Sequence, residues 1–288
     1  MPFEIIAASN MGFCQGVRRA FERVAEVARV EKGVETLGAL VHNRQVQEKL
    51  QESGVTAVNN IQEISGKTVV ISAHGVAPAI LNAIKGKNVK VVDTTCPYVT
   101  RAQQAASRLH KAGYYVIVYG DAGHIEVKGI IGWAQGEGVA TLDVKGIGDA
   151  ECLPKKLGVL SQTTQIPSRF AAFVGNLISS PVFRDRELRV IDTICHDSRH
   201  RQAETLEIAA GCDLVFVIGG RHSANTRHLK EMCGEITETY LVETAEEIEP
   251  ALLKGKKRVG VTAGASTDDE TIEEVLKKLR QISASGQI

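Results

Sequence analysis

The 288-residue sequence has no excess of either charge and no long apolar run. Lys and Arg together number 34, as do Asp and Glu. The chain therefore has no overall field to attract nucleic acid or an anionic membrane. No apolar run approaches the roughly 20 residues that cross a bilayer, and the first residues lack the basic and apolar regions of a signal peptide. We therefore expect a cytoplasmic protein that binds neither nucleic acid nor membrane.

Several common site motifs are also missing. No Gly-x-x-x-x-Gly-Lys-Ser/Thr sequence is present, which excludes a P-loop, and no clear Gly-x-Gly-x-x-Gly follows the first predicted strand. The six cysteines form no Cys-x-x-Cys pair, which argues against a zinc ribbon or a ferredoxin-type cluster. In a reducing compartment an even cysteine count does not indicate disulfides. A cysteine in a loop is then better explained as a metal ligand or a catalytic residue.

Short runs rich in Val and Ile alternate with longer amphipathic stretches, which is the pattern of an α/β protein with mainly parallel sheets. Strands are predicted at residues 3–8, 68–73, 89–95, 114–120, 157–162, 188–193, 214–219 and 258–264. Helices are predicted at residues 16–29, 45–53, 99–112, 168–178, 199–210 and 267–282. Thr267 and Glu270 have the spacing of a capping box, which predicts where the last helix begins. No linker rich in Pro, Gly or Ser divides the chain.

One motif recurs along the chain. Val92-Asp93-Thr94-Thr95-Cys96 returns as Ile191-Asp192-Thr193-Ile194-Cys195, each copy between an apolar strand and a predicted helix, and Gly12-Phe13-Cys14-Gln15-Gly16 is a weaker third copy. The repeat predicts three related α/β units. They are residues 1–95 with Cys14, His42 and His74; residues 96–193 with Cys96, His124, Glu126 and Thr163; and residues 194–288 with Cys195, Ser223, Asn225 and Ser266. The carboxyl ends of parallel strands, where these residues fall, are the places where ligands bind.

The cysteines divide into two groups. Cys152, Cys212 and Cys233 fit ordinary packing, whereas the other three occupy polar, Gly- or Pro-flanked strand ends. Three thiolates are one short of the number that closes a cubane cluster, so one iron would keep an open coordination site. A zinc site and plain packing remain alternatives at this point.

Polar side chains follow several of the predicted strands. His42, His74 and His124 each come at or shortly after an apolar run, and imidazole suits a phosphate because its charge adapts near neutral pH. Hydroxyl and amide residues follow other strands, in the segments 162–164, 223–226 and 263–267, where helix N-capping is the ordinary explanation and anion binding the functional one. Glu126 forms a His-x-Glu pair with His124, but the Pro-Cys-x-x-Cys of zinc deaminases is absent.

Taken together, these segments resemble the IspH/LytB family of 4-hydroxy-3-methylbut-2-enyl diphosphate reductases, and they occur in the family's order over nearly the whole chain. The resemblance rests on Gly12-Phe13-Cys14-Gln15-Gly16-Val17, His42-Asn43, Ser72-Ala73-His74-Gly75, Asp93-Thr94-Thr95-Cys96-Pro97, Gly123-His124-Ile125-Glu126-Val127, Gln162-Thr163-Thr164, Asp192-Thr193-Ile194-Cys195, Ser223-Ala224-Asn225 and Thr262-Ala263-Gly264-Ala265-Ser266.

The resemblance implies three pseudo-symmetric α/β units with mainly parallel sheets, in a trefoil around a central 4Fe–4S cluster. It implies that Cys14, Cys96 and Cys195 ligate this cluster and leave one iron open. The implied substrate-binding residues are His42, His74, His124, Thr163, Thr164, Ser223, Asn225 and Ser266, with Glu126, Thr163 and His124 in catalytic positions. The implied substrate is an allylic diphosphate, reduced to isopentenyl and dimethylallyl diphosphate in the last step of the non-mevalonate isoprenoid pathway. The implied electron donor is a ferredoxin or a flavodoxin.

Four positions depart from the family pattern, namely Ile125, Ile130, His196 and Ala224. They leave room for a related reductase or a non-redox dehydratase that acts on another allylic substrate. A redox or iron sensor would explain the cysteines but not the histidines and Glu126. A zinc hydrolase is the remaining alternative.

Overall fold

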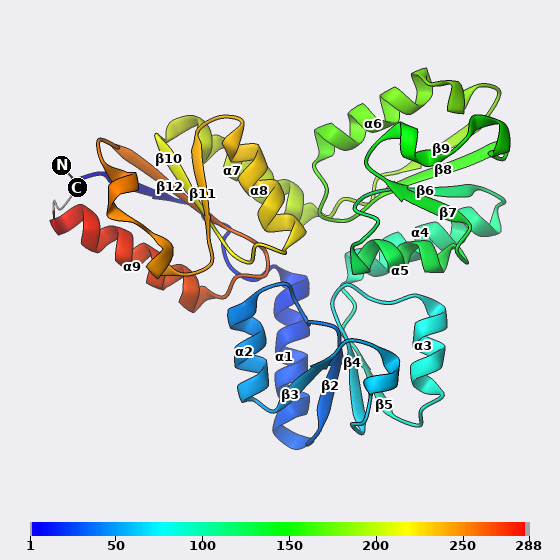
Figure 1. Ribbon diagram of the computed structural model, residues 1–288, viewed down its shortest axis with the longest axis horizontal. Helices are drawn as coiled ribbons and strands as arrows, with labels where there is room; N and C mark the ends of the chain where they lie inside the picture. Colours follow the sequence, from blue (N-terminus) through cyan, green and yellow to red (C-terminus); the bar gives the residue numbers. More distant parts are fainter. Residues whose placement is uncertain (1, 286–288) are drawn as a thin grey trace. The chain divides into compact units, whose positions relative to one another are not determined.

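The computed structural model describes residues 2–285, which form twelve strands, nine α-helices and six short 3₁₀-helices (Figure 1). The strands are β1 (Glu4–Ala7), β2 (Val34–Leu37), β3 (Val55–Val58), β4 (Thr68–Ile71), β5 (Lys90–Asp93), β6 (Tyr115–Tyr119), β7 (Gly138–Thr141), β8 (Lys156–Ser161), β9 (Glu187–Ile191), β10 (Leu214–Ile218), β11 (Glu238–Val242) and β12 (Arg258–Ala263). The helices are α1 (Gln15–Val30), α2 (Arg44–Glu52), α3 (Pro78–Lys85), α4 (Pro97–Lys111), α5 (Ile125–Trp133), α6 (Pro167–Ser179), α7 (His196–Gly211), α8 (Ala224–Gly234) and α9 (Asp269–Ser285). Within these residues no helix is both long and apolar enough to cross a membrane.

The strands form three four-stranded sheets in which every pair is parallel. The orders are β1-β12-β10-β11, β5-β4-β2-β3 and β9-β8-β6-β7, so the same order recurs three times. In each sheet an edge strand leads to one of the three loop cysteines. These sheets confirm the predicted α/β class and its three parallel-sheet units.

Parallel strands are joined by crossover helices, which cover both faces of a sheet and leave its central strands buried and apolar on both sides. β10 shows this most clearly, since all five of its side chains are buried. One face packs against α9 through Leu276 and Leu279, and the other packs against α7 and α8 through Ile208 and Leu229. Burial of each such side chain stabilises the fold by roughly 1.5–3 kcal/mol.

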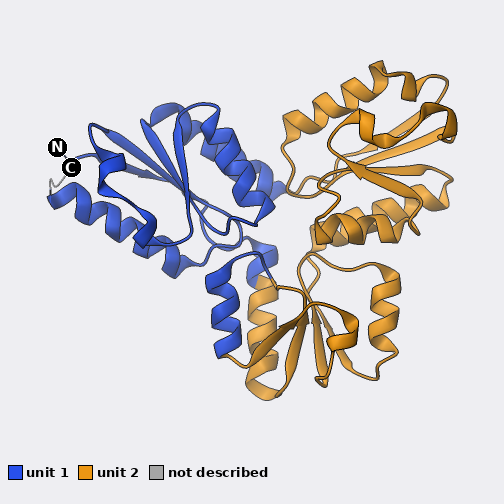
Figure 2. Cartoon of the chain, in the orientation of Figure 1, with its two compact units in different colours: residues 1–18, 41–52, 196–288 blue, residues 19–40, 53–195 orange. Residues whose placement is uncertain are grey.

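The chain divides into two compact units, coloured separately in Figure 2. Unit 1 comprises residues 1–18, 41–52 and 196–288 with the β1-β12-β10-β11 sheet, and unit 2 comprises residues 19–40 and 53–195 with the other two sheets. The opening strand, expected within a first unit of residues 1–95, pairs instead with β12 of the last sheet, from Glu4 beside Arg258 to Ala7 beside Val261. The strand before a cysteine forms one edge of each sheet, and in the last sheet this edge strand is β1, from the start of the chain. The three-unit boundaries at residues 95 and 193 stay a prediction.

Local details differ from the sequence expectations at two functional segments. The strand before His42 ends at Leu37, so residues 38–41 form a loop. The last helix begins at Asp269 and its N-cap is Asp268, whose Oδ1 accepts from the Thr271 amide at 3.1 Å. The capping box predicted from Thr267 and Glu270 is therefore wrong, because the Thr267 hydroxyl donates instead to the Ile218 carbonyl at 3.0 Å.

Candidate functional site

The three loop cysteines share one backbone arrangement. Each lies directly before a helix, and its amide donates to a carbonyl in the loop after the neighbouring strand. The three bonds run from Cys14 to Ala265 at 3.0 Å, from Cys96 to Ala73 at 3.0 Å, and from Cys195 to Thr163 at 2.9 Å. The predicted equivalence of the three cysteines therefore has a structural basis in each sheet.

The repeated Asp-Thr pair before two of these cysteines makes the same hydrogen bonds in both copies. Asp93 and Asp192 accept a hydrogen bond from the residue directly before each cysteine, at 2.9 and 3.1 Å. Thr94 donates its hydroxyl to the carbonyl at the end of β4, and Thr193 donates to the carbonyl at the end of β8. Both pairs therefore connect the turn before the cysteine to the end of the adjacent strand.

Cys96 and Cys195 lie near each other and near Glu126 in unit 2. Burial raises the pKa of the Cys96 thiol, the amides of the first turn of α4 lower it, and the negative charges of Cys195 and Glu126 raise it. Cys14, Cys96 and Cys195 are all partly exposed, and thiolates at helix N-termini are the ligands that iron–sulfur clusters use. The donor chemistry at these positions fits a cluster. By contrast, Cys233 is fully buried in the core and Cys152 is exposed.

Glu126 and Thr163 form a buried acid pair in unit 2. The Glu126 side chain is 2% exposed. Its Oε1 accepts from the Thr163 amide at 2.7 Å, and its Oε2 accepts from the Thr163 hydroxyl at 2.9 Å. Burial raises the pKa of the carboxyl to about 7, although both hydrogen bonds lower it. A carboxyl with this pKa can give up or take a proton near neutral pH.

Two histidines lie in the same unit. The His124 Nδ1 accepts from the Glu126 amide at 3.1 Å, which makes His124 the N-cap of α5. A ring nitrogen that accepts carries no proton, so the His124 proton is on Nε2 and the ring is a neutral donor. His74 meets the His124 ring edge-on with centroids 5.4 Å apart, and its Nδ1 lies 3.4 Å from the Ser72 hydroxyl. We call Cys96, His74, His124, Glu126 and Thr163 the acid site.

Unit 1 carries a different cluster of polar groups around the turn that follows β10. At Gly220 the chain passes so close to the loop before α2 that a Cβ would lie 2.1 Å from the His42 carbonyl oxygen. Three residues further on, Ser223 is the N-cap of α8 and accepts from the Thr226 amide at 3.4 Å. The N-termini of α2 and α8 therefore meet at one turn, and free amides at helix N-termini favour an anion.

Several buried polar atoms at this turn have no hydrogen-bond partner among the residues that the structure describes. They are both amide atoms of Asn225, the Ser266 hydroxyl, the Thr226 hydroxyl and the Asn43 Nδ2. Buried polar atoms are nearly always paired, so a cluster of orphaned ones indicates a polar ligand. We call His42, Asn43, Ser223, Asn225 and Ser266 the anion site.

Asn43 is the member of the anion site that sequence reasoning missed. Its Oδ1 accepts from the Val46 amide at 3.1 Å and caps α2, which leaves Nδ2 as a donor. An Asn directly before a predicted helix indicates a cap, but the orphaned nitrogen is visible only in the folded structure.

The anion site is electropositive. Partial burial lowers the pKa of His42, and the nearby cationic groups His222 and Arg227 lower it further. His42 is therefore mainly neutral at pH 7 and donates without charge, while Arg227 supplies positive charge.

The predicted site residues are thus divided between the units. Cys14, His42, Ser223, Asn225 and Ser266 belong to unit 1, and Cys96, Cys195, His74, His124, Glu126, Thr163 and Thr164 belong to unit 2. Two of the departures from the family pattern have structural explanations. Ile130 is fully buried in the core beside α4, and the His196 ring stacks on His200 at 6.3 Å between centroids.

The chain is similar to known proteins over nearly its whole length. The LytB protein family model matches residues 5–280. The 4-hydroxy-3-methylbut-2-enyl diphosphate reductase of Dehalococcoides mccartyi is 53% identical over 98% of this chain and 100% of its own length. The enzyme of the same name from an Anaeromyxobacter species is 42% identical over 98% of this chain and 99% of its own length.

Two solved structures are also similar. One is (E)-4-hydroxy-3-methyl-but-2-enyl diphosphate reductase, described as the terminal enzyme of the non-mevalonate pathway, with 36% identity, a TM-score of 0.70, and coverage of 98% of this chain and 100% of that chain. The other is the E-1-hydroxy-2-methyl-but-2-enyl-4-diphosphate reductase from Plasmodium falciparum, with 26% identity, a TM-score of 0.89, and coverage of 96% of this chain and 88% of that chain. From the family model and these relatives, which span nearly its whole length, we conclude that the chain belongs to the LytB family.

Proposed function

We propose that this protein is an iron–sulfur reductase that removes the hydroxyl of 4-hydroxy-3-methylbut-2-enyl diphosphate. The reaction consumes two electrons and two protons: the carbon–oxygen bond breaks, the oxygen leaves as water, and a proton adds to carbon to give isopentenyl or dimethylallyl diphosphate. The observation that carries the proposal is the buried Glu126–Thr163 pair, whose carboxyl has a pKa of about 7. The relatives' names supply the substrate.

Cys14, Cys96 and Cys195 would hold a 4Fe–4S cluster with one open iron. When bound, the cluster would supply a Lewis-acidic metal and would transfer single electrons. A ferredoxin or a flavodoxin would deliver these electrons to the cluster. The equivalent turns that place the three thiols, and the chemistry of the donor set, support this assignment.

The anion site would bind the diphosphate. Asn225, Ser266 and Asn43 present orphaned buried donors, and Arg227 supplies positive charge that offsets the phosphate charge. His42, His74, Ser223 and Thr164 would add further donors to the substrate. The His124 Nε2–H, fixed by the cap that its Nδ1 makes, would donate to the substrate as a neutral group.

Glu126 would supply the proton that converts the departing hydroxyl to water. The Thr163 hydroxyl, 2.9 Å from the carboxyl, would pass the proton on or keep the carboxyl oriented. Because burial excludes water from the carboxyl, the proton is retained up to about pH 7 and remains available for transfer. The rate of the reaction should therefore fall as the pH rises through about 7.

The test is Glu126→Gln, which keeps the size of the side chain and an acceptor for the Thr163 amide but has no acidic proton to give. With the cluster verified by its absorption and iron content, we expect the substrate-dependent rate to fall by about 10²-fold or more. Glu137→Gln is the control, since that side chain is 73% exposed. A cluster-bearing Glu126→Gln variant with full turnover would remove the acid role. A cluster without turnover in the wild-type protein would favour another allylic substrate.

A further inference from the structure

The turn before Cys14 lacks the threonine that holds the other two cysteine turns. In unit 2, Thr94 and Thr193 stand two residues before Cys96 and Cys195 and bond to the carbonyls that end β4 and β8. The residue two before Cys14 is Gly12. The equivalent carbonyl, at Ala263 at the end of β12, therefore needs another donor.

A threonine is disfavoured at the position of Gly12. Its φ is +83°, and a Cβ would lie 2.3 Å from the Asp269 Oδ1. The left-handed backbone disfavours any residue with a Cβ at this position, and the Asp269 carboxylate would also have to move. The donor must come from outside the turn.

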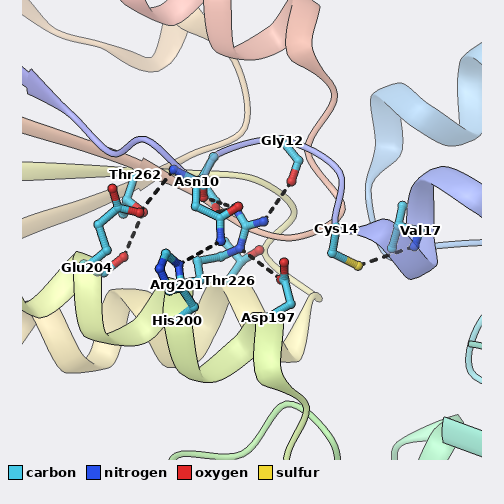
Figure 3. Close-up of polar contacts among 12 residues, drawn as sticks. Asn10, Gly12, Cys14, Val17, Asp197, His200, Arg201, Glu204, Thr226 and Thr262 are labelled. Carbon is cyan, nitrogen blue, oxygen red and sulfur yellow. Dashed lines mark hydrogen bonds and ion pairs between the residues drawn. The ribbon is translucent and has the colours of Figure 1, made fainter. Parts of the chain in front are cut away.

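Arg201 of α7 is that donor. Its Nη1 donates to the Ala263 carbonyl at 3.0 Å and to the Asn10 carbonyl at 2.6 Å, and its Nη2 donates to the Gly12 carbonyl at 3.1 Å. Figure 3 shows the guanidinium between the Asn10–Gly12 segment and Asp197, with Cys14 next along the chain. The Arg201 guanidinium thus connects the end of β12, before Ser266, to the turn before Cys14. In the other two sheets a threonine hydroxyl makes the equivalent connection.

The Arg201 guanidinium is a buried charge, and burial of a charge costs free energy unless its donors are paired. The Arg201 side chain is 1% exposed, and its ion partner Asp197 lies 3.5 Å away. A buried guanidinium is tolerated only when its donors are paired, and three carbonyls meet that need here. Glu204, one turn later on α7, accepts from the Ser9 amide at 2.6 Å and the Asn10 amide at 3.1 Å. The same helix therefore supplies donors and acceptors to one loop (Figure 3).

We propose that Arg201 is a positioning residue that fixes Cys14 relative to the Ser266 loop within unit 1. The Cys14 amide donates to the Ala265 carbonyl. Arg201 bonds to Gly12, two residues before Cys14, and to Ala263, two residues before Ala265, so it holds both segments that this bond joins. The consequence for the reductase rests on the proposed role of Cys14 as a cluster ligand. The consequence for the Cys14 thiol itself does not depend on that role.

The experiment measures alkylation of each cysteine, by mass spectrometry, in the full-length cluster-free protein. We compare the wild-type protein with Arg201→Met, with Arg201→Lys, and with Thr193→Val as the equivalent change in unit 2. Cys233, fully buried in unit 1, reports global unfolding of that unit. Arg258→Met is the matched control, because that arginine is half exposed and lies at the opposite end of β12.

Arg201→Met removes three hydrogen bonds to carbonyls, so we expect it to raise the alkylation rate of Cys14 at least about tenfold, the factor for loss of a single charge-assisted hydrogen bond. Cys96, Cys195 and Cys233 should react as in the wild type. Thr193→Val should speed Cys195 alone. Arg201→Lys should fall between wild type and Met, because an ammonium cannot match the planar fork.

Two results would overturn the proposal. One is an unchanged Cys14 rate in Arg201→Met. The other is a parallel rise at Cys14 and Cys233, which would make Arg201 a general stabiliser of unit 1. In the cluster-loaded protein, iron release to a chelator should also be about tenfold faster in Arg201→Met than in Arg258→Met. If the wild-type chain takes up no cluster, the proposed function fails while the alkylation result still decides the role of Arg201.

Discussion

The buried Glu126 carboxyl makes the stability of the protein depend on pH in a direction unusual for a glutamate. Its pKa is about 7 in the folded protein against 4.5 for the ordinary group. Between these pH values the unfolded chain releases this proton while the folded protein keeps it. The stabilising effect of the neutral carboxyl is therefore fully present below pH 4.5 and is lost as the pH rises through 7.

The size of the effect follows from the shift. A shift from 4.5 to about 7 corresponds to about 3 kcal/mol at roughly 1.4 kcal/mol per pH unit. Glu126→Gln stays neutral at every pH and keeps an acceptor for the Thr163 amide. The free energy of unfolding of the variant relative to wild type should then grow by about 2 kcal/mol between pH 5 and pH 8.

Urea unfolding at pH 5, 6, 7 and 8 measures this difference, on cluster-free protein so that no bound group shifts the equilibrium. A difference in the free energy of unfolding that is added equally at every pH reflects packing and does not affect the predicted change with pH. Glu26→Gln, at an exposed position of unit 2 beside Arg23, whose charge is constant over this range, should show no pH-dependent difference. A Glu126→Gln difference that is the same at all four pH values would refute the buried, proton-retaining carboxyl.

The remaining predictions concern the anion site and the cysteines. Asn43→Asp keeps the cap on α2 but replaces the orphaned donor by a charged acceptor, so KM for the diphosphate should rise about tenfold or more. Asn60 is the N-cap of the short 3₁₀-helix Ile61–Glu63 in unit 2, and Asn60→Asp should leave KM unchanged. Equal KM values for these two variants would take Asn43 out of the anion site. Cys96→Ser should lower the iron bound after reconstitution, and Cys152→Ser, at an exposed position, should not. Full iron content in Cys96→Ser would exclude that cysteine as a ligand.

The fold was predictable where apolar runs were long. The eight expected strands are all present, and the long amphipathic stretches became α1, α4, α6, α7 and α9. β2, β3, β7 and β11 were missed because polar or small residues interrupt or shorten their apolar runs. α5 was missed because two glycines, Gly129 and Gly132, weaken its helical signal. The pairing of β1 with β12 depends on contacts between the ends of the chain, which local patterns do not encode.

The candidate site was predictable from strand ends and the repeated motif, because both features are local. Arg201 was not, since a charged residue in a helix ordinarily faces solvent and its burial depends on carbonyls about 60 and 190 residues away in sequence. One local signal existed: Gly12 stands where the other two copies of the motif have a threonine. The raised pKa of Glu126 likewise depends on the packing around it, which no motif specifies.

The central claim is tested most directly by turnover. The full-length protein is reconstituted anaerobically with iron and sulfide, and oxidation of dithionite-reduced viologen is followed with and without 4-hydroxy-3-methylbut-2-enyl diphosphate. We predict substrate-dependent oxidation of two viologen equivalents per molecule of isopentenyl or dimethylallyl diphosphate formed. A well-formed cluster that oxidises no viologen on addition of this substrate, or product formed without any reductant, would contradict the proposed reduction.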